Sequence, residues 1–172
     1  MELEPHDCTL DPWRTLLIAQ AVVLDAIEAQ LRDEGQLPLA WFEVLARLSS
    51  TEGGAVRMQN LADRLVLSRS GVTRLVDRIE AAGLIERASC PSDRRGTFAV
   101  LTDAGRRAFT DAHPIVDRAV EEHFARHLDP SETRLLGSIL AKLLDAHGYA
   151  VDRAGPCALS EQAPAERVSI QH

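Results

Sequence analysis

The stretch "MQNLADRLVLSRSGVTRLVDRIEAAG", residues 58–83, reads as two short helices joined by a very tight step. Apolar residues recur at helical spacing on both sides of Val66-Leu67, and these two residues leave room only for a sharp turn. Ser68 is expected to be the N-cap of the second helix, and Gly83 fits the left-handed residue that ends it. This pattern predicts a helix-turn-helix.

Residues 84–101, "LIERASCPSDRRGTFAVL", predict a β-hairpin directly after the second helix. "LIERA" (84–88) and "TFAVL" (97–101) are short strand-like runs, and the loop between them contains Pro and Gly. A hairpin in this position makes the unit a winged helix-turn-helix. We expect its recognition helix over 68–82 and its wing over 85–101.

Apolar periodicity predicts two helices before this unit. The first begins at Asp11 as N-cap and runs to Gly35, with an apolar stripe wide enough to pack on more than one side. The second begins near Pro38 and gives way to a loop at "STEGG", residues 50–54.

Two more helices are predicted after the hairpin. Thr102 caps a long fifth helix, in which Pro114 must produce a kink or a break. "DPSE" at 129–132 is a capping box that opens a sixth helix, and Gly148 stops it. The expected fold is therefore mostly α with a small β-hairpin wing.

The chain is expected to divide into four parts. The first and sixth helices carry more apolar surface than one lobe can cover, and such faces usually meet a partner. The parts are an N-terminal dimerisation helix (1–35), the winged helix-turn-helix lobe (36–102), C-terminal dimerisation helices (103–147) and a flexible tail (148–172).

Composition indicates a globular cytoplasmic protein without catalytic machinery. The 172 residues are 45% hydrophobic and 26% charged, no apolar run reaches membrane-spanning length, and no secretory signal is visible. Cys8, Cys90 and Cys157 are odd in number and lack CxxC spacing, which favours a reducing compartment. No motif of an enzyme, a metal site or a cofactor site stands out, so no enzyme activity and no cofactor are expected.

The distribution of charge favours a nucleic-acid partner. The net charge is −7, yet residues 57–107 hold ten arginines and six acidic residues, a net +4. The remainder holds nine basic and twenty acidic residues, a net −11. One basic segment in an acidic body is the pattern expected of a DNA-binding protein.

The solvent face of the expected recognition helix carries groups that read DNA. Arginine can bind guanine bidentately, and Ser or Thr can donate to bases or phosphates. The candidate contacts on this helix are Arg69, Ser70, Thr73, Arg74 and Arg78, with Asp77 on the same face.

The wing tip carries an arginine pair, Arg94 and Arg95, behind Asp93. A narrow A·T-rich minor groove concentrates negative potential and attracts inserted arginine. Asp93 can brace the turn and orient Arg95. Exposed arginine pairs are usually only solvated, but beside a basic recognition face the DNA-contact interpretation is favoured.

From about Leu37 to Gly105 the sequence resembles the MarR family of bacterial transcription regulators. The resemblance lies in a Leu-Ala pair, Ser-x-Ser-x-Val-Thr-Arg, Gly-Leu-Ile-x-Arg, Asp-x-Arg and Leu-Thr-x-x-Gly, in this order. Pro38 departs from the Thr or Ser usual at that position.

The resemblance implies an obligate homodimer held by the first, fifth and sixth helices, with Arg95 as the wing arginine. It also implies a regulator, most simply a repressor, that reads a pseudo-palindromic operator. A small ligand in a cleft between the lobes would release it. Trp13 and Trp41 are candidates for lining a pocket for an aromatic or anionic effector, although core packing is the commoner use of Trp.

Three alternatives stay open at this point. Cys90 lies near basic residues that lower a thiol pKa, which would suit a redox-responsive variant. His123 and His127, like His113 and Asp117, are four apart, a spacing that suits zinc but lacks a completing ligand. A winged helix can also serve as a protein-interaction module, but that use would not require arginines on both recognition helix and wing.

Overall fold

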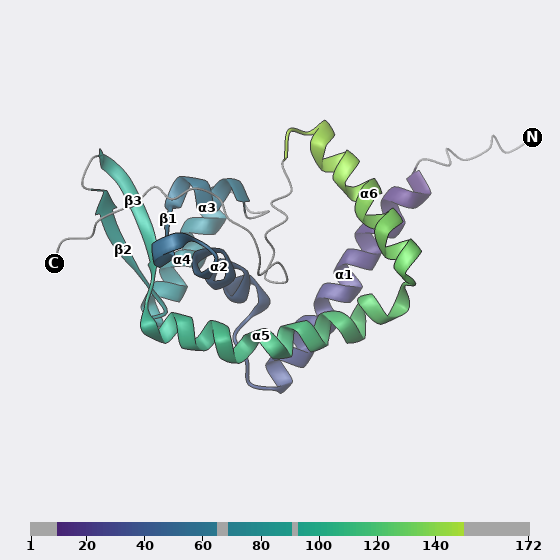
Figure 1. Ribbon diagram of the computed structural model, residues 1–172, viewed down its shortest axis with the longest axis horizontal. Helices are drawn as coiled ribbons and strands as arrows, with labels where there is room; N and C mark the ends of the chain where they lie inside the picture. Colours follow the sequence, from purple (N-terminus) through teal and green to yellow (C-terminus); the bar gives the residue numbers. More distant parts are fainter. Residues whose placement is uncertain (1–9, 65–68, 91–92, 150–172) are drawn as a thin grey trace, which may run out of the picture.

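The computed structural model describes residues 10–64, 69–90 and 93–149, and for Leu10, 62–64, 69–70, 90 and 93–96 it describes only the backbone. Helices dominate, and a small sheet lies at one end of the long axis (Figure 1). In chain order the elements are α1 (Leu10–Asp33), α2 (Leu39–Ser49), η1 (Glu52–Gly54), β1 (Ala55–Arg57), α3 (Met58–Arg64), α4 (Arg69–Ala81), β2 (Ile85–Cys90), β3 (Asp93–Leu101), α5 (Asp103–His123), η2 (Ala125–His127) and α6 (Pro130–Ala146). The predicted fold class, mostly α with a small wing, is confirmed.

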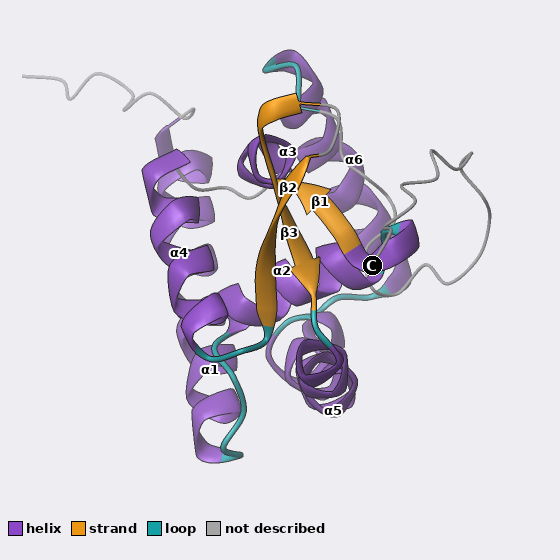
Figure 2. Ribbon diagram, turned by 90° about the vertical axis from the view of Figure 1, so that its left-hand side faces the viewer, coloured by secondary structure: helices purple, strands orange, loops and turns teal. Residues whose placement is uncertain are grey.

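The sheet is antiparallel, with β3 between β1 and β2 (Figure 2). Ile85 lies opposite Leu101 at the base of the wing, and Cys90 pairs with Asp93 at its tip. The strands are longer than predicted, because cross-strand pairing extends them into the polar residues expected to form the loop. The strand β1 was not predicted, since its partner is the distant β3, with Arg57 opposite Phe98.

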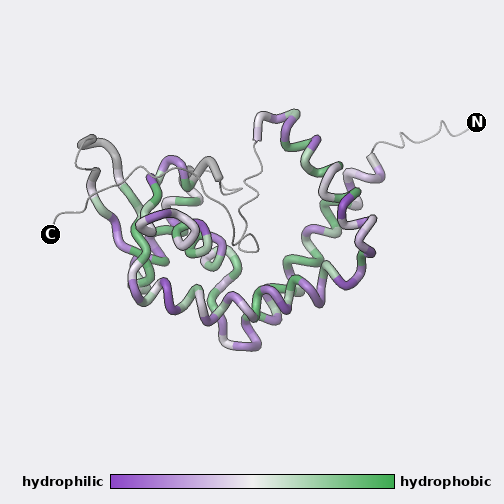
Figure 3. Tube along the Cα trace, viewed as in Figure 1, coloured by the Kyte–Doolittle hydropathy of each residue, from purple (hydrophilic) through white to green (hydrophobic). Residues whose placement is uncertain are grey.

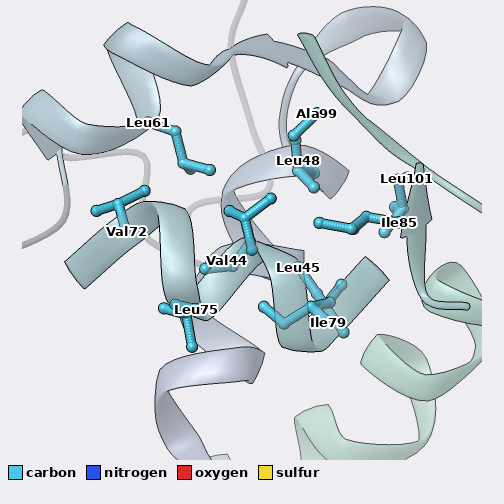
Figure 4. Packing of buried hydrophobic residues seen from close by; sticks show 11 residues of the cluster. Val44, Leu45, Leu48, Leu61, Val72, Leu75, Ile79, Ile85, Ala99 and Leu101 are labelled. Atoms are coloured by element: carbon cyan, nitrogen blue, oxygen red, sulfur yellow. The ribbon is translucent and has the colours of Figure 1, made fainter. Parts of the chain in front are cut away.

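The core of the winged lobe lies between α2, α3, α4 and the sheet (Figure 4). Helix α4 contributes one face to it, as its apolar spacing predicts. The buried residues of this core are Val44, Leu45, Leu48, Leu61, Val72, Leu75, Val76, Ile79, Ile85, Ala99 and Leu101. The core therefore fixes which side of α4 faces outward.

A second core joins α1, α2 and α5. The ring of Phe42 stacks on that of Phe109 with centroids 5.2 Å apart, and His113 stands edge-on to both rings. Its buried members are Ile27, Leu31, Phe42, Ala46, Ala112, Val116 and Ala119. Helix α5 thereby connects the winged lobe to α1, and Figure 1 shows it running between the two ends of the molecule.

The predicted capping signals of α5 and α6 are confirmed. The Thr102 hydroxyl accepts from the Gly105 N–H at 3.0 Å and donates to the Gly83 carbonyl at 2.8 Å. Asp129 and Glu132 form the reciprocal capping box. The Asp129 carboxylate accepts hydrogen bonds from the Ser131 hydroxyl and from the backbone N–H groups of Glu132 and Ser131. These bonds, the one from the hydroxyl most of all, hold the pKa of Asp129 below its ordinary value.

Two helices differ in detail from their predicted form. Helix α1 includes Leu10, so Asp11 lies inside its first turn, where a carboxylate still interacts favourably with the helix dipole. Of the kink or break expected at Pro114, the break does not occur: α5 is continuous, and it is curved in Figure 1. Pro114 lies on the exposed side, while Ala112 and Val116 are buried against neighbouring helices, and this packing offsets the lost backbone hydrogen bond.

The large exposed apolar side chains of the described residues lie on α1, at the end of α5 and on α6. Figure 3 shows the hydropathy along the trace of these helices. Helix α6 buries none of its residues within the chain. The exposed residues are Trp13, Leu17, Ile18, Val22, Leu24, Val120, Phe124, Leu135, Ile139, Leu143 and Leu144. Within the described ranges, no helix is long and apolar enough to cross a membrane.

Candidate nucleic-acid interface

The outward face of α4 is polar and mostly basic. Val72, Val76 and Ile79 point into the core with at most 1% of their surface exposed. On the other side of the helix, the residues Thr73, Arg74, Asp77 and Arg78 are all exposed. The hydrophobic face thus holds α4 against the lobe, and the side chains predicted to read DNA remain accessible.

The first turn of α4 holds two further predicted contacts. The backbone of Arg69 and Ser70 is helical, and their side chains lie outside the described part of the chain. The predicted N-cap Ser68 also lies outside it. First-turn side chains of a recognition helix are the ones that meet base edges in a helix-turn-helix, so these positions stay candidates.

The predicted wing contacts Arg94 and Arg95 lie at the start of β3, as does the predicted brace Asp93. The pairing of Cys90 with Asp93 places these backbones at the tip of the hairpin. Their side chains lie outside the described part, so the roles assigned to them remain predictions.

At the base of the wing, an arginine links the sheet to α4. Arg87 of β2 binds Asp77 and Glu80 of α4 through its guanidinium. On the edge of the sheet, the guanidinium of Arg57 lies 5.5 Å from the centre of the Phe98 ring. The sequence placed Arg57 and Arg87 in the basic segment, and Arg87 also in the Gly-Leu-Ile-x-Arg motif, but it did not predict their partners, because no local pattern reveals a partner in another element.

The two tryptophans predicted to line an effector pocket do not share a cluster. Trp41 is partly buried against the core of the winged lobe, together with Phe109 of α5. Trp13 lies near the start of α1 and is 55% exposed. The N-terminal end of α1 is at the end of the molecule opposite the wing in Figure 1.

Of the histidines considered as metal ligands, His113 contacts its candidate partner Asp117, whereas His123 contacts Gln30. His113 Nδ1 lies 3.1 Å from Asp117 Oδ2, and His123 Nε2 lies 3.0 Å from Gln30 Oε1. No three His, Cys, Asp or Glu residues come together as a metal site in the residues that the structure describes. The backbone of Cys90 belongs to β2, and Cys8 and Cys157 lie outside the described residues.

Comparison with known proteins identifies the family. The family model described as MarR family matches residues 36–96, the winged lobe. The crystal structure of AbsC, a MarR family transcriptional regulator from Streptomyces coelicolor, is 31% identical with a TM-score of 0.77, and the match covers 86% of this chain and 99% of AbsC. The chain belongs to the MarR family.

Other MarR-type proteins match in the same way. Sco3205, a MarR family regulator from Streptomyces coelicolor solved in complex with DNA, is 28% identical with a TM-score of 0.76, and the match covers 90% of this chain and 98% of that protein. The HTH-type transcriptional regulator YkoM of Bacillus subtilis is 32% identical over 52% of this chain and 57% of its own length. The chain spans about half the length of the curated relatives it matches. All of these relatives are named as regulators of transcription, not enzymes.

Proposed function

We propose that this MarR-family chain is a dimeric, sequence-specific DNA-binding regulator of transcription. The observation that carries the proposal is the exposed face of α4, which presents Thr73, Arg74 and Arg78, together with a wing whose second strand, β3, begins with Asp-Arg-Arg. Sco3205, which shares this fold, was solved with DNA bound. In this arrangement α4 enters the major groove, and the wing reaches the adjacent minor groove. Such a protein works in the cytoplasm, where bacterial DNA lies.

The proposed dimer explains the apolar surface away from the wing. Helix α6 contributes no buried residue to its own chain, yet it exposes Leu135, Ile139 and Leu143. Exposed apolar surface of this extent marks an interaction site, and a two-fold partner would cover α1, the end of α5 and α6 together. Two recognition helices would then meet half-sites about 34–36 Å apart, so the operator would be a pseudo-palindrome.

Selection from a pool of random DNA duplexes tests the proposed function. The wild-type chain should enrich one pseudo-palindromic sequence and bind it far more tightly than scrambled DNA. Binding that is equal for all sequences, or no binding at moderate salt, would contradict the proposal. A winged helix that serves only as a protein-interaction module would show no binding to DNA at moderate salt.

The first prediction concerns the arginines of the interface. Arg95→Ala should cost about 1–3 kcal/mol of operator affinity and relax the preference for A·T at the flanks of the site. Arg74→Ala should cost a similar amount, but its loss of specificity should fall on central bases of each half-site. Affinities for the selected duplex and its base-substituted variants measure both effects.

Arg94→Ala is the control for the wing. As the variable residue of Asp-x-Arg, Arg94 should make at most a phosphate contact, so its loss should lower the salt slope by about one and leave sequence preference unchanged. Equal behaviour of the Arg94 and Arg95 variants would mean that the wing is only an electrostatic contact.

The second prediction concerns a repressor released by a small aromatic or anionic ligand. Trp41 of α2 and Phe109 of α5 both pack against the core of the winged lobe, where a bound ligand would alter the angle between the lobes. A screen of phenolic carboxylates should find a compound that changes Trp fluorescence and releases the selected duplex. Trp41→Phe should abolish the fluorescence response, whereas Trp13→Phe tests whether the exposed tryptophan takes part. Absence of any response would leave a constitutive DNA-binding protein.

A further inference from the structure

Arg87 of the wing strand β2 is bound to two carboxylates of α4. Its Nη2 lies 2.5 Å from Asp77 Oδ1, and its Nη1 donates to Glu80 Oε2. Its backbone N–H also donates to Glu80 Oε1 at 3.1 Å. Strand and helix are therefore joined by three hydrogen bonds through one residue.

These bonds join α4 to β2 beyond a short connection that is itself held by the Thr102 hydroxyl, which donates to the Gly83 carbonyl at 2.8 Å. Helix α4 ends at Ala81, the chain turns through Gly83, whose φ of +74° is left-handed, and β2 begins at Ile85. Ile85 is buried in the core, and side chains alternate along a strand, so Arg87 points to the same side as Ile85. The core therefore holds β2 at Ile85, and Arg87 attaches the strand to α4 two residues closer to the wing tip.

The same contacts change the charge of the outward face of α4. Asp77 is exposed and lies among Thr73, Arg74 and Arg78. An unpaired carboxylate in this position would repel DNA phosphates. The guanidinium of Arg87 compensates this charge from the side, which leaves the arginines of α4 as the dominant charges facing outward.

We propose that Arg87 is a positioning residue that holds the recognition helix and the wing at a fixed mutual angle, so that both reach DNA as one unit. The part of this proposal that concerns DNA recognition rests on the proposed function. Arginine suits this role because its planar fork reaches two carboxylates at once, whereas the single ammonium of lysine cannot match that geometry. Arg87 therefore acts through α4 and the wing and is not itself a DNA contact.

Hydrogen exchange tests the brace without DNA. In Arg87→Gln, the amides of β2 and β3 should exchange about tenfold faster, while those of α1 and the second half of α5 keep their wild-type rates. In Arg87→Lys, the exchange rates of the wing amides should lie between those of the wild type and those of Arg87→Gln. The control is Arg107→Gln, an exposed arginine of α5, which should leave exchange in the wing unchanged. Wild-type exchange in the wing of Arg87→Gln would overturn the brace.

A double-mutant cycle tests the consequence for DNA. The probe is a duplex of about 30 base pairs selected by the wild-type chain, compared with its scrambled version, so that nonspecific charge effects cancel in the ratio of affinities. Arg87→Gln should lower this ratio about tenfold, and it should have no further effect once Asp77→Asn and Glu80→Gln are present.

The outcomes separate the two proposals. If Arg87→Gln lowers the affinity ratio equally in the wild type and in the Asp77→Asn/Glu80→Gln background, Arg87 contacts DNA directly. If the ratio is unchanged, Arg87 has no role in recognition. Either result overturns the inference. If the wild-type chain enriches no sequence, the proposed function fails, and hydrogen exchange still decides whether Arg87 is a brace.

Discussion

Gly105→Ala is expected to destabilise the folded chain by about 3 kcal/mol or more, the upper part of the range for overpacked sites. A Cβ at this position would lie 2.0 Å from the Leu84 carbonyl oxygen and 2.8 Å from Leu101 Cδ1. The Leu84 oxygen is backbone and already accepts the Thr102 N–H at 3.2 Å, so it cannot move without breaking that bond. The first turn of α5 would have to lift away from the wing.

Urea unfolding at one fixed protein concentration measures this effect, because the stability of a dimer depends on concentration. The matched control is Gly137→Ala in α6, where an added Cβ meets nothing within 4 Å. That change should stabilise the helix by about 0.5–1 kcal/mol. Equal unfolding midpoints for the two variants would contradict the close approach at Gly105.

The second large effect is expected from Ile139→Glu combined with Leu143→Glu in α6. The two side chains are four residues apart on one helical face, and they are 45% and 51% exposed in the single chain. Burial of one such side chain contributes about 1.5–3 kcal/mol, and a two-fold interface contains each substitution twice. The double variant should therefore be monomeric in sedimentation velocity at micromolar concentration.

The affinity of the Ile139→Glu/Leu143→Glu variant for the operator should decrease because the dimer is lost. A monomer can meet only one half-site, and loss of the linked second site should weaken binding of the selected duplex about 100-fold or more. The winged lobe should keep its core, since none of its core residues comes from α6, so the signal of Trp41 should be retained.

Arg134→Glu combined with Ser138→Glu is the matched control for this variant. Both residues are exposed, are also four apart on α6, and lie on the side away from Ile139 and Leu143. They introduce the same two glutamates, so a general effect of acidic charge would appear in both variants. A dimer that survives Ile139→Glu/Leu143→Glu, or that is lost equally in the control, would refute α6 as the interface.

The elements that could be predicted from the sequence are those with short-range signals. The apolar spacing of Val72, Leu75, Val76 and Ile79 determined which face of α4 is buried, and all four are in the core. Thr102 caps α5 as predicted, because an N-cap bond spans only three residues. The exposure of Arg74 and Arg78 on α4 followed from the same helical period.

The wrong or missing predictions involve competition between local preference and distant partners. Pro114 favours a break, but the burial of Ala112 and Val116 keeps α5 continuous. The polar wing residues favour a loop, but pairing across the hairpin extends β3 to Asp93. Strand β1 is only three residues long and has no pattern of its own without β3.

The sequence by itself therefore determined the order of the helices, their buried faces, the caps and the hairpin, because helical period, capping and turn chemistry act between residues a few positions apart. The tertiary structure alone decided the close approach of Gly105 to Leu84 and the attachment of Arg87 to α4. These features depend on where separate elements meet. Contacts between residues far apart in the sequence leave no periodic pattern near either residue, so these features become visible only in the folded chain.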